Sequence, residues 1–361
     1  MSVNPERPYQ DLPPLPPACN LHTPKIIRKT ISASRALATA GTSAKRLPNP
    51  NILIHAIPLL EARASSEIEN IVTTNDELFK AASNVANPTL ATREALNYRE
   101  ALYTGYQSLK QRPLCLNTAT LVCSVITGNN SEVRTGSGTY IGRSDTKKRI
   151  YTPPQGREEI IRHLNHWENF MHRNQDFDPL IKMALLHYQF EAIHPFSDGN
   201  GRTGRILNVL FLVESNLLDQ PITYLSGYIV ENKGEYYERL NAVTQNADWE
   251  SWIEFILTAV EVTSEWTDHL VTRIYQLIDQ TTEQLKDTKL PVRDLAHLLF
   301  TQPYLRYADL METQGISRPT ATKWAEALTQ CGIVERQKVG KNVIFINWQY
   351  LDELFNTPLP R

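Results

Sequence analysis

HPFSDGNGRTGR, residues 194–205, places an imidazole, a carboxylate, a glycine-rich turn and two guanidinium groups within one short segment. The apolar spacing before it, in residues 179–193, and after it, in residues 206–215, predicts two helices. The segment is therefore expected to be a loop that leads into a helix start. A helix N-terminus presents unpaired N–H groups and the positive end of the helix dipole, which together attract phosphate oxygens. The segment indicates phosphate chemistry.

The polar side chains of this segment suit the transfer of a phosphate-bearing group. The imidazole of His194 can accept a hydroxyl proton near neutral pH, which makes it the expected general base. Asp198 can hold Mg²⁺, which usually keeps several waters and bridges phosphate oxygens. The loop amides and Asn200 can hold the α- and β-phosphates, while Arg202 and Arg205 supply donors for the remaining charge. Phosphate transfer depends mainly on such positioning and charge neutralisation.

The segment resembles the signature of Fic-domain proteins, H-x-F-x-(D/E)-G-N-G-R-x-x-R, and matches it at every specified position. The resemblance implies a mainly α-helical Fic core with a β-hairpin flap. It also implies an activity, the transfer of AMP from ATP to a hydroxyl side chain of a target protein. In the signature, the residues expected to bind ATP are Gly199, Asn200, Gly201, Arg202, Thr203, Gly204 and Arg205.

A zinc site is the competing chemical interpretation of this region. His187, Glu191 and His194 fall at helical spacings and could share one face of a helix. Structural zinc usually recruits cysteines, and catalytic zinc would leave the two arginines and the glycine-rich loop without a role. The phosphate interpretation is therefore preferred.

A second motif, SSEIEN, starts at Ser65. An apolar spacing of i, i+4, i+8 and i+11 from Leu60 predicts a helix, which Pro58 is expected to begin. The motif resembles the inhibitory motif of autoinhibited Fic proteins, (S/T)-x-x-x-E-(G/N), with Glu69 and Asn70 at its last two specified positions. The resemblance implies that the glutamate reaches the second arginine of the signature and occupies space that the γ-phosphate needs. A solvated helix face is the plain alternative.

Residues 139–152 contain two short runs around a polar turn and predict a β-hairpin. Their place before the signature resembles that of the Fic flap. The resemblance implies that the exposed edge pairs with a segment of the target protein by strand addition, with Ile150 and Tyr151 bordering the nucleotide. On the helix after the signature, Tyr236 and Tyr237 match a tyrosine pair that lines the adenine pocket in that family. A surface hairpin and a buried aromatic cluster are the plain alternatives.

Two predicted helices, 307–313 and 319–330, and two predicted strands, 334–339 and 343–347, lie near the C-terminus. This order resembles a small winged helix-turn-helix domain, and it implies DNA as a partner. The side chains that could contact DNA phosphates are Arg318, Lys323, Arg336, Lys338 and Lys341. Such modules also serve as protein-docking or dimer surfaces, so both alternatives stay open.

The composition limits the remaining classes of protein. The chain has 361 residues, of which 41% are hydrophobic. Its formal net charge of −2 argues against a protein that binds nucleic acid over most of its surface. No stretch approaches the roughly 20 apolar residues that span a bilayer, and the N-terminus does not read as a signal peptide. The cysteines show no metal-type pairing and indicate a reducing compartment, so a cytoplasmic location with no membrane partner is expected.

Three parts are expected along the chain. Residues 1–95 hold an N-terminal arm and the inhibitory helix, residues 96–265 the Fic catalytic core, and residues 285–361 the winged helix-turn-helix domain. The proline-rich residues 1–24 are expected to form an extended arm that packs on a neighbour or stays mobile. Residues 31–50 are expected to be irregular.

The sequence therefore predicts a Mg²⁺-dependent protein adenylyltransferase that uses ATP, modifies a target protein and itself, and is held in check by Glu69. A homodimer is expected from the resemblance. Two alternatives remain: a nucleotide-sensing, DNA-binding regulator, and a Fic enzyme that transfers another group or removes AMP.

Overall fold

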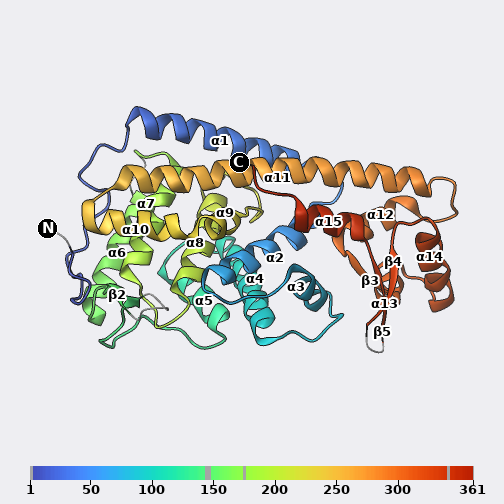
Figure 1. Ribbon diagram of the computed structural model, residues 1–361, viewed down its shortest axis with the longest axis horizontal. Coiled ribbons are helices and arrows are strands. Elements are labelled where there is room, and N and C mark those ends of the chain that lie inside the picture. Colours follow the sequence, from blue (N-terminus) through green and yellow to red (C-terminus); the bar gives the residue numbers. More distant parts are fainter. Residues whose placement is uncertain (1–2, 143–147, 174–175, 340–341, 361) are drawn as a thin grey trace.

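The computed structural model describes residues 3–142, 148–173, 176–339 and 342–360, which form a mainly helical molecule with small antiparallel sheets (Figure 1). The helices are α1 (Pro24–Ala44), α2 (Asn51–Ile68), α3 (Asn75–Ala82), α4 (Leu90–Leu109), α5 (Leu116–Thr127), α6 (Arg157–Arg173), α7 (Pro179–Ile193), α8 (Asn200–Glu214), α9 (Leu225–Glu231), α10 (Lys233–Asn246), α11 (Trp249–Leu285), α12 (Val292–Thr301), α13 (Tyr307–Gln314), α14 (Arg318–Gln330) and α15 (Trp348–Asn356). The strands are β1 (Ile141–Gly142), β2 (Arg149–Tyr151), β3 (Tyr304–Arg306), β4 (Glu335–Val339) and β5 (Asn342–Ile346). The predicted mainly α-helical class is confirmed.

Helix α11 runs along most of the molecule, and α1 lies beside its first half (Figure 1). Thr23 caps α1 by accepting from the N–H of Ile26, and Pro24 occupies the first turn, where its missing N–H costs nothing. The expectation that residues 31–50 are irregular is wrong, because α1 continues to Ala44. Its small residues, such as Ala33 and Ala40, are buried and allow close packing on α11.

The N-terminal arm packs on its own chain. Leu12, Leu15 and Leu21 are buried in the hydrophobic cluster that also contains α7 and α8. The N–H of Tyr9 donates to the carbonyl of Thr152 over 2.9 Å. The expectation of an arm on a neighbour or a mobile arm is therefore wrong, because the leucines between the prolines bury apolar surface within the molecule.

Helix α2, which precedes Glu69, begins at Asn51, and Pro58 lies inside it. The prediction that Pro58 begins this helix is wrong. Ile52, Leu53 and Ile57 are buried, so the apolar face of the helix extends upstream of the proline. Helix α2 packs mainly against α4 and α9.

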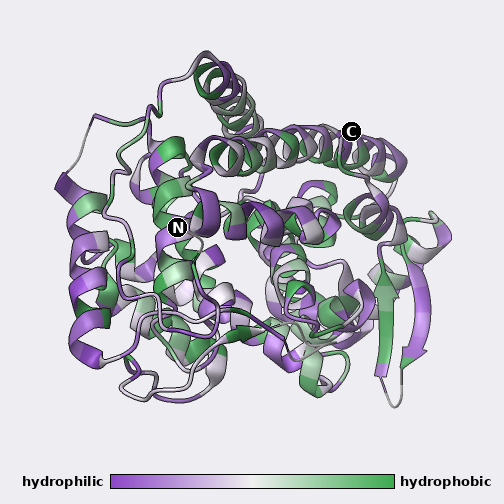
Figure 2. Ribbon diagram, turned by 60° about the vertical axis from the view of Figure 1, so that its left-hand side comes forward, coloured by the Kyte–Doolittle hydropathy of each residue, from purple (hydrophilic) through white to green (hydrophobic). Residues whose placement is uncertain are grey.

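The C-terminal helices and strands form a small module beside the far end of α11. The sheet order is β3-β5-β4, and all pairs are antiparallel. Strand β5 is hydrophobic and largely buried, whereas its neighbour β4 is hydrophilic and exposed (Figure 2). Helices α13 and α14 followed by this hairpin are compatible with the predicted winged helix-turn-helix domain. Residues 340 and 341 lie outside the described residues.

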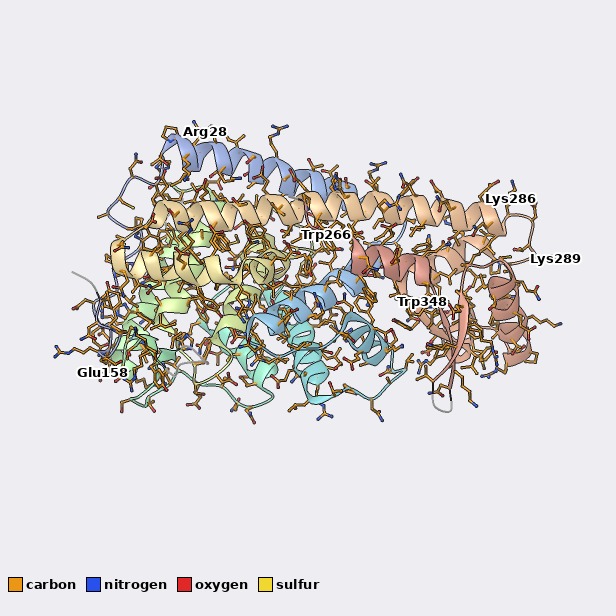
Figure 3. The ribbon with its side chains drawn as sticks, in the orientation of Figure 1. Arg28, Glu158, Trp266, Lys286, Lys289 and Trp348 are labelled. Atoms are coloured by element: carbon orange, nitrogen blue, oxygen red, sulfur yellow. The ribbon has the colours of Figure 1, made fainter. Side chains whose placement is uncertain are left out.

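The module is not isolated from the rest of the chain. Its core residues belong to one hydrophobic cluster with Leu53 of α2, Phe79 of α3 and Leu270 of α11. The indole N–H of Trp266 on α11 donates to the carbonyl of Thr357 over 3.0 Å (Figure 3). Within the part of the chain that the structure describes, no helix is long and apolar enough to cross a membrane.

Candidate active site

The signature segment turns sharply between two buried helices. Helix α7 ends at His194, whose φ of 50° and ψ of 60° lie in the left-handed region. Helix α8 starts after Gly199, which has a φ of 75°. The side chain of Asn200 closes the loop, because it accepts from the N–H of Phe196 and donates to its carbonyl, both over 2.8 Å. Because the Asn200 side chain is occupied in this way, the group of Asn200 that can contact phosphate is its backbone N–H.

The start of α8 presents backbone groups that could bind a ligand. Its first N–H groups have no partner inside the helix, as at any helix N-terminus. A Cβ at Gly201 would lie 2.3 Å from Glu69 Oε1 and 2.9 Å from Arg205 Nη1. Because no side chain fits there, the glycine lets both of these groups approach the helix start. This cradle suits phosphate oxygens.

His194 is neutral at physiological pH. Burial, followed by the nearby Arg134 guanidinium, lowers its pKa to about 4. A neutral imidazole is the form that accepts a proton, so His194 can act as a general base without first losing one.

Arg134 fixes the backbone that carries His194, a role that sequence analysis missed. Its Nε donates to the carbonyl of His194 over 2.7 Å, and its Nη2 donates to the carbonyls of Ile193 and Pro154 over 3.2 and 2.5 Å. The N–H of Arg134 also donates to the carbonyl of Pro195 over 2.9 Å. Backbone acceptors so distant in sequence leave no pattern by which this residue could be recognised.

Asp198 lies at the rim of the loop with 77% of its side chain exposed. One carboxylate oxygen accepts from the N–H of Gly199 over 2.7 Å, and the other lies 3.9 Å from Arg202 Nη2. An exposed carboxylate beside a phosphate cradle fits Mg²⁺, which takes one or two protein carboxylates and completes its shell with waters and substrate phosphates. Among the described residues, no three side chains of metal-binding type cluster together.

The zinc alternative finds no support in the surroundings of His187. Its Nε2 lies 3.0 Å from the Tyr236 hydroxyl, and its ring stacks on Trp252 with centroids 5.8 Å apart. Burial, followed by the Arg205 guanidinium, lowers its pKa to about 3. His187 is therefore a neutral residue of the aromatic core.

The two signature arginines are both buried and both paired with carboxylates of N-terminal helices. Arg202 Nη1 donates to Glu94 of α4 over 3.1 Å. Arg205 Nη2 donates to Glu69 Oε1 over 2.9 Å, so the structure brings these two residues into contact. Burial raises the pKa of Glu69, but the Arg205 guanidinium outweighs it and holds that pKa below its usual value.

Ser65 and Asn70, the other specified residues of the SSEIEN motif, bind Arg205 and Lys233 respectively. Ser65 Oγ accepts from Arg205 Nε over 2.7 Å, and the Ser65 carbonyl accepts from Nη2 over 3.0 Å. Asn70 has a φ of 62° just after the helix end, and its side chain accepts from Lys233 over 2.9 Å. The motif therefore binds Arg205 with two of its members and anchors the end of α2 with the third.

The flap strands are in place next to α7. Strand β1 pairs with β2, with Ile141 opposite Tyr151. Tyr151 is only 7% exposed, and its hydroxyl donates to the carbonyl of Ala192 over 2.8 Å. Its side chain anchors the flap to α7, and Ile150, the preceding residue on the strand, points to the opposite face. Residues 143–147 of the expected docking edge lie outside the described residues.

The tyrosine pair divides into a buried and an exposed member. Tyr236 is 1% exposed and its hydroxyl contacts His187, whereas Tyr237 is 43% exposed. Their ring centroids are 5.2 Å apart. Tyr237 therefore presents the ring that is accessible to a ligand, while Tyr236 supports it from the core.

Comparisons with known proteins match three parts of the chain. Residues 27–107 match the Fic/DOC family N-terminal model, residues 119–212 the Fic/DOC family model, and residues 277–350 the model of the protein adenylyltransferase SoFic-like C-terminal domain. A probable protein adenylyltransferase of Aquifex aeolicus is 39% identical over 77 residues, which are 21% of this chain and 23% of that protein. Protein adenylyltransferase fic-1 of Caenorhabditis elegans is 30% identical over 137 residues, 36% of this chain and 24% of that protein. The matched segments thus span about a quarter of these curated relatives.

Solved structures share the fold. A Fic family protein from Desulfovibrio desulfuricans G20 superposes with a TM-score of 0.59 at 18% identity, over 93% of this chain and 98% of that one. A fragment of Fic-1 from C. elegans gives a TM-score of 0.53 at 18% identity, over 70% and 74% of the two chains. With the complete signature on the loop between α7 and α8, and with three family models that together match most of its length, this chain belongs to the Fic/DOC family.

Proposed function

We propose that this chain is a protein adenylyltransferase that transfers AMP from ATP to a Ser, Thr or Tyr hydroxyl of a target protein and of itself, and that Glu69 inhibits it. The observation that carries the proposal is that a neutral His194 and the N-terminus of α8 belong to one loop, with Arg205 and Glu69 against Gly201 in the space that phosphate would take. Its relatives' names support the same activity.

In the proposed reaction the hydroxyl oxygen of the target attacks the α-phosphorus of ATP, and the bond to pyrophosphate breaks. His194 takes the hydroxyl proton. Arg134 holds the backbone of His194 in its turn by donating to the His194 carbonyl. The N–H groups at the start of α8 hold phosphate oxygens, and Arg202 neutralises charge. Asp198 would hold Mg²⁺, and a bound ion would supply charge stabilisation to the departing phosphates. Ile150 and Tyr237 border the nucleotide, with Tyr151 and Tyr236 behind them.

Inhibition follows from the ion pair between Glu69 and Arg205. While Glu69 occupies the guanidinium, Arg205 cannot bind the γ-phosphate, and the carboxylate lies against Gly201, where the phosphate chain would pass. ATP then binds without the orientation that in-line attack requires. Releasing Glu69 leaves Arg205 held by Ser65 and ready for the phosphate.

The flap at 139–152 is proposed to dock the target by strand addition, since β1 is paired on one side only among the described strands. A homodimer, a cytoplasmic location and DNA contact by the C-terminal module belong to the same proposal. Arg318, which lies over the Tyr307 ring, and the exposed β4 strand are the surfaces available for DNA. Two alternatives, transfer of another group and removal of AMP, predict a different pattern of protein labelling by radioactive ATP.

The test is incubation of Glu69→Gly protein with cell extract and either α-labelled or γ-labelled ATP. Transfer of AMP labels protein from the α-labelled nucleotide only. Label from γ-labelled ATP indicates phosphate transfer, and no label from either, together with binding of a defined DNA duplex, favours a nucleotide-sensing regulator.

A further inference from the structure

A cleft of about 250 Å³ lies between the N-terminal helices and the C-terminal module, away from the signature loop. Helices α2, α3 and α4 form one wall, and the segment after α12 with strand β3 forms the other. Its floor is apolar and includes Leu59, Phe79 and Pro303. Pockets for small molecules combine such an apolar floor with a few well-placed polar groups.

Among the described residues of the polar lining, Arg99 carries a positive charge that forms no ion pair. The Arg306 guanidinium is neutralised by Asp309, with Nη2–Oδ1 and Nε–Oδ2 distances of 2.7 and 3.1 Å. Arg99 of α4 makes no ion pair or hydrogen bond with any residue that the structure describes, and the carboxylate that acts on it is its chain neighbour Glu100. Burial lowers the pKa of Arg99.

His55 adds no second positive charge to the cleft. It lies on α2 at the rim of the cleft, and burial together with the Arg99 guanidinium lowers its pKa, so the ring is neutral at physiological pH. A neutral imidazole can still donate one hydrogen bond to a ligand. A partly desolvated guanidinium without a partner is unfavourable, and a bound anion would remove that penalty.

We propose that this cleft binds a small amphiphilic anion, with its carboxylate or phosphate group on Arg99 and its apolar body on Leu59, Phe79 and Pro303. The proposal is independent of the transfer reaction. It has a structural consequence for α2, because that helix lines the cleft and leads directly into Glu69. An occupant therefore restrains the helix that carries the inhibitory residue.

The test is isothermal titration of the full chain, at constant ionic strength, with four probes of similar size: benzoate, phenyl phosphate, benzyl alcohol and benzylamine. A non-hydrolysable ATP analogue with Mg²⁺ fills the nucleotide site throughout. We expect benzoate or phenyl phosphate to bind more tightly than the neutral and cationic probes. The stronger of the two anions identifies the head group as a carboxylate or a phosphate.

Arg99→Met keeps the aliphatic stem and removes the charge, and we expect it to weaken anion binding at least about tenfold, as for loss of one charge-assisted contact. Its thermal stability should be unchanged or higher, because the unpaired charge is gone. Arg99→Lys should retain part of the binding. Arg93→Met, an exposed position on the same helix, is the matched control and should bind like the wild type.

Hydrogen exchange locates the bound anion. We expect slower exchange in α2 and in residues 301–306 of the wild type, and no such change in Arg99→Met. The proposal is overturned if neither anion binds more tightly than benzyl alcohol, if Arg99→Met binds as tightly as the wild type, or if slowed exchange appears only at residues 200–205.

Discussion

Replacing Glu69 with glycine is expected to raise AMP transfer about tenfold or more at a moderate cost in folding stability. The carboxylate makes one contact with Arg205, at 2.9 Å, and its side chain is 36% exposed. Arg205 is buried, but it keeps its two contacts with Ser65, and solvent screens the exposed side of Glu69, so losing the pair should cost about 1–3 kcal/mol of folding stability. Glu69 follows the last residue of α2, so a glycine there does not interrupt the helix interior.

The effect on catalysis is larger because the carboxylate and the γ-phosphate compete for one guanidinium. A coupling of about 1–3 kcal/mol between two such binding events corresponds to roughly 5–150-fold. After the substitution, Arg205 remains held by Ser65 Oγ and the Ser65 carbonyl, so it is already positioned for ATP.

The assay is the initial rate of incorporation from α-labelled ATP, with melting temperatures measured in parallel. Glu67→Gly is the matched control, since it removes a carboxylate from the last turn of α2 that pairs with Arg63 rather than Arg205. The control should transfer AMP at the wild-type rate. A folded Glu69→Gly protein that gains no activity over the wild type refutes the inhibitory role of this ion pair.

Three further predictions concern other residues. Asp198→Ala should lose activity together with the Mg²⁺ dependence of nucleotide binding, and calorimetric titration showing equal Mg²⁺ dependence in both proteins would leave Asp198 a structural role. Arg134→Met should lower kcat about 10- to 100-fold with little change in the KM for ATP, because it frees the backbone of His194. Arg157→Met removes a longer hydrogen bond to a nearby carbonyl and should leave kcat unchanged. An equal loss of kcat in both variants would contradict the proposed role of Arg134 in holding the His194 backbone. Burial raises the pKa of Glu61 to about 7, so the folded chain keeps a proton that the unfolded chain releases near pH 4.5. The free energy of unfolding should therefore fall as the pH rises from about 4.5 through 7. In melting experiments across this pH range, Glu61→Gln should reduce the pH dependence of stability, and an unchanged pH dependence would contradict the prediction.

The sequence predicted helix α7 well because its ends carry local signals, whereas α8 begins at Asn200, inside the signature, rather than at the predicted residue 206. Helix α7 has the predicted bounds 179–193, where Pro179 occupies the first turn and the signature histidine ends the helix in a left-handed conformation. The mainly helical class and the family were likewise predictable, since the signature is a contiguous segment.

Prediction failed where long-range packing decides the outcome. Helix α1 buries a stripe at helical spacing that includes Ile26, Leu37 and Ala40, but the stripe contains small and polar residues, and its stability comes from packing against α11. The proline-containing arm is fixed by leucines whose partners lie far along the chain. The roles of Arg134 and of the Asn200 side chain depend on backbone carbonyls and amides, which no side-chain pattern reports.

The central claim is that His194 transfers AMP to protein hydroxyls. Its most direct test is mass spectrometry of Glu69→Gly and Glu69→Gly/His194→Ala proteins after incubation with ATP and Mg²⁺, with nucleotide binding measured for both. We predict one or more AMP groups on hydroxyl side chains of the single variant, and a rate about 10²- to 10⁴-fold lower in the double variant with ATP binding retained. Equal modification of both proteins, or no modification of a folded, ATP-binding Glu69→Gly protein, would contradict the claim.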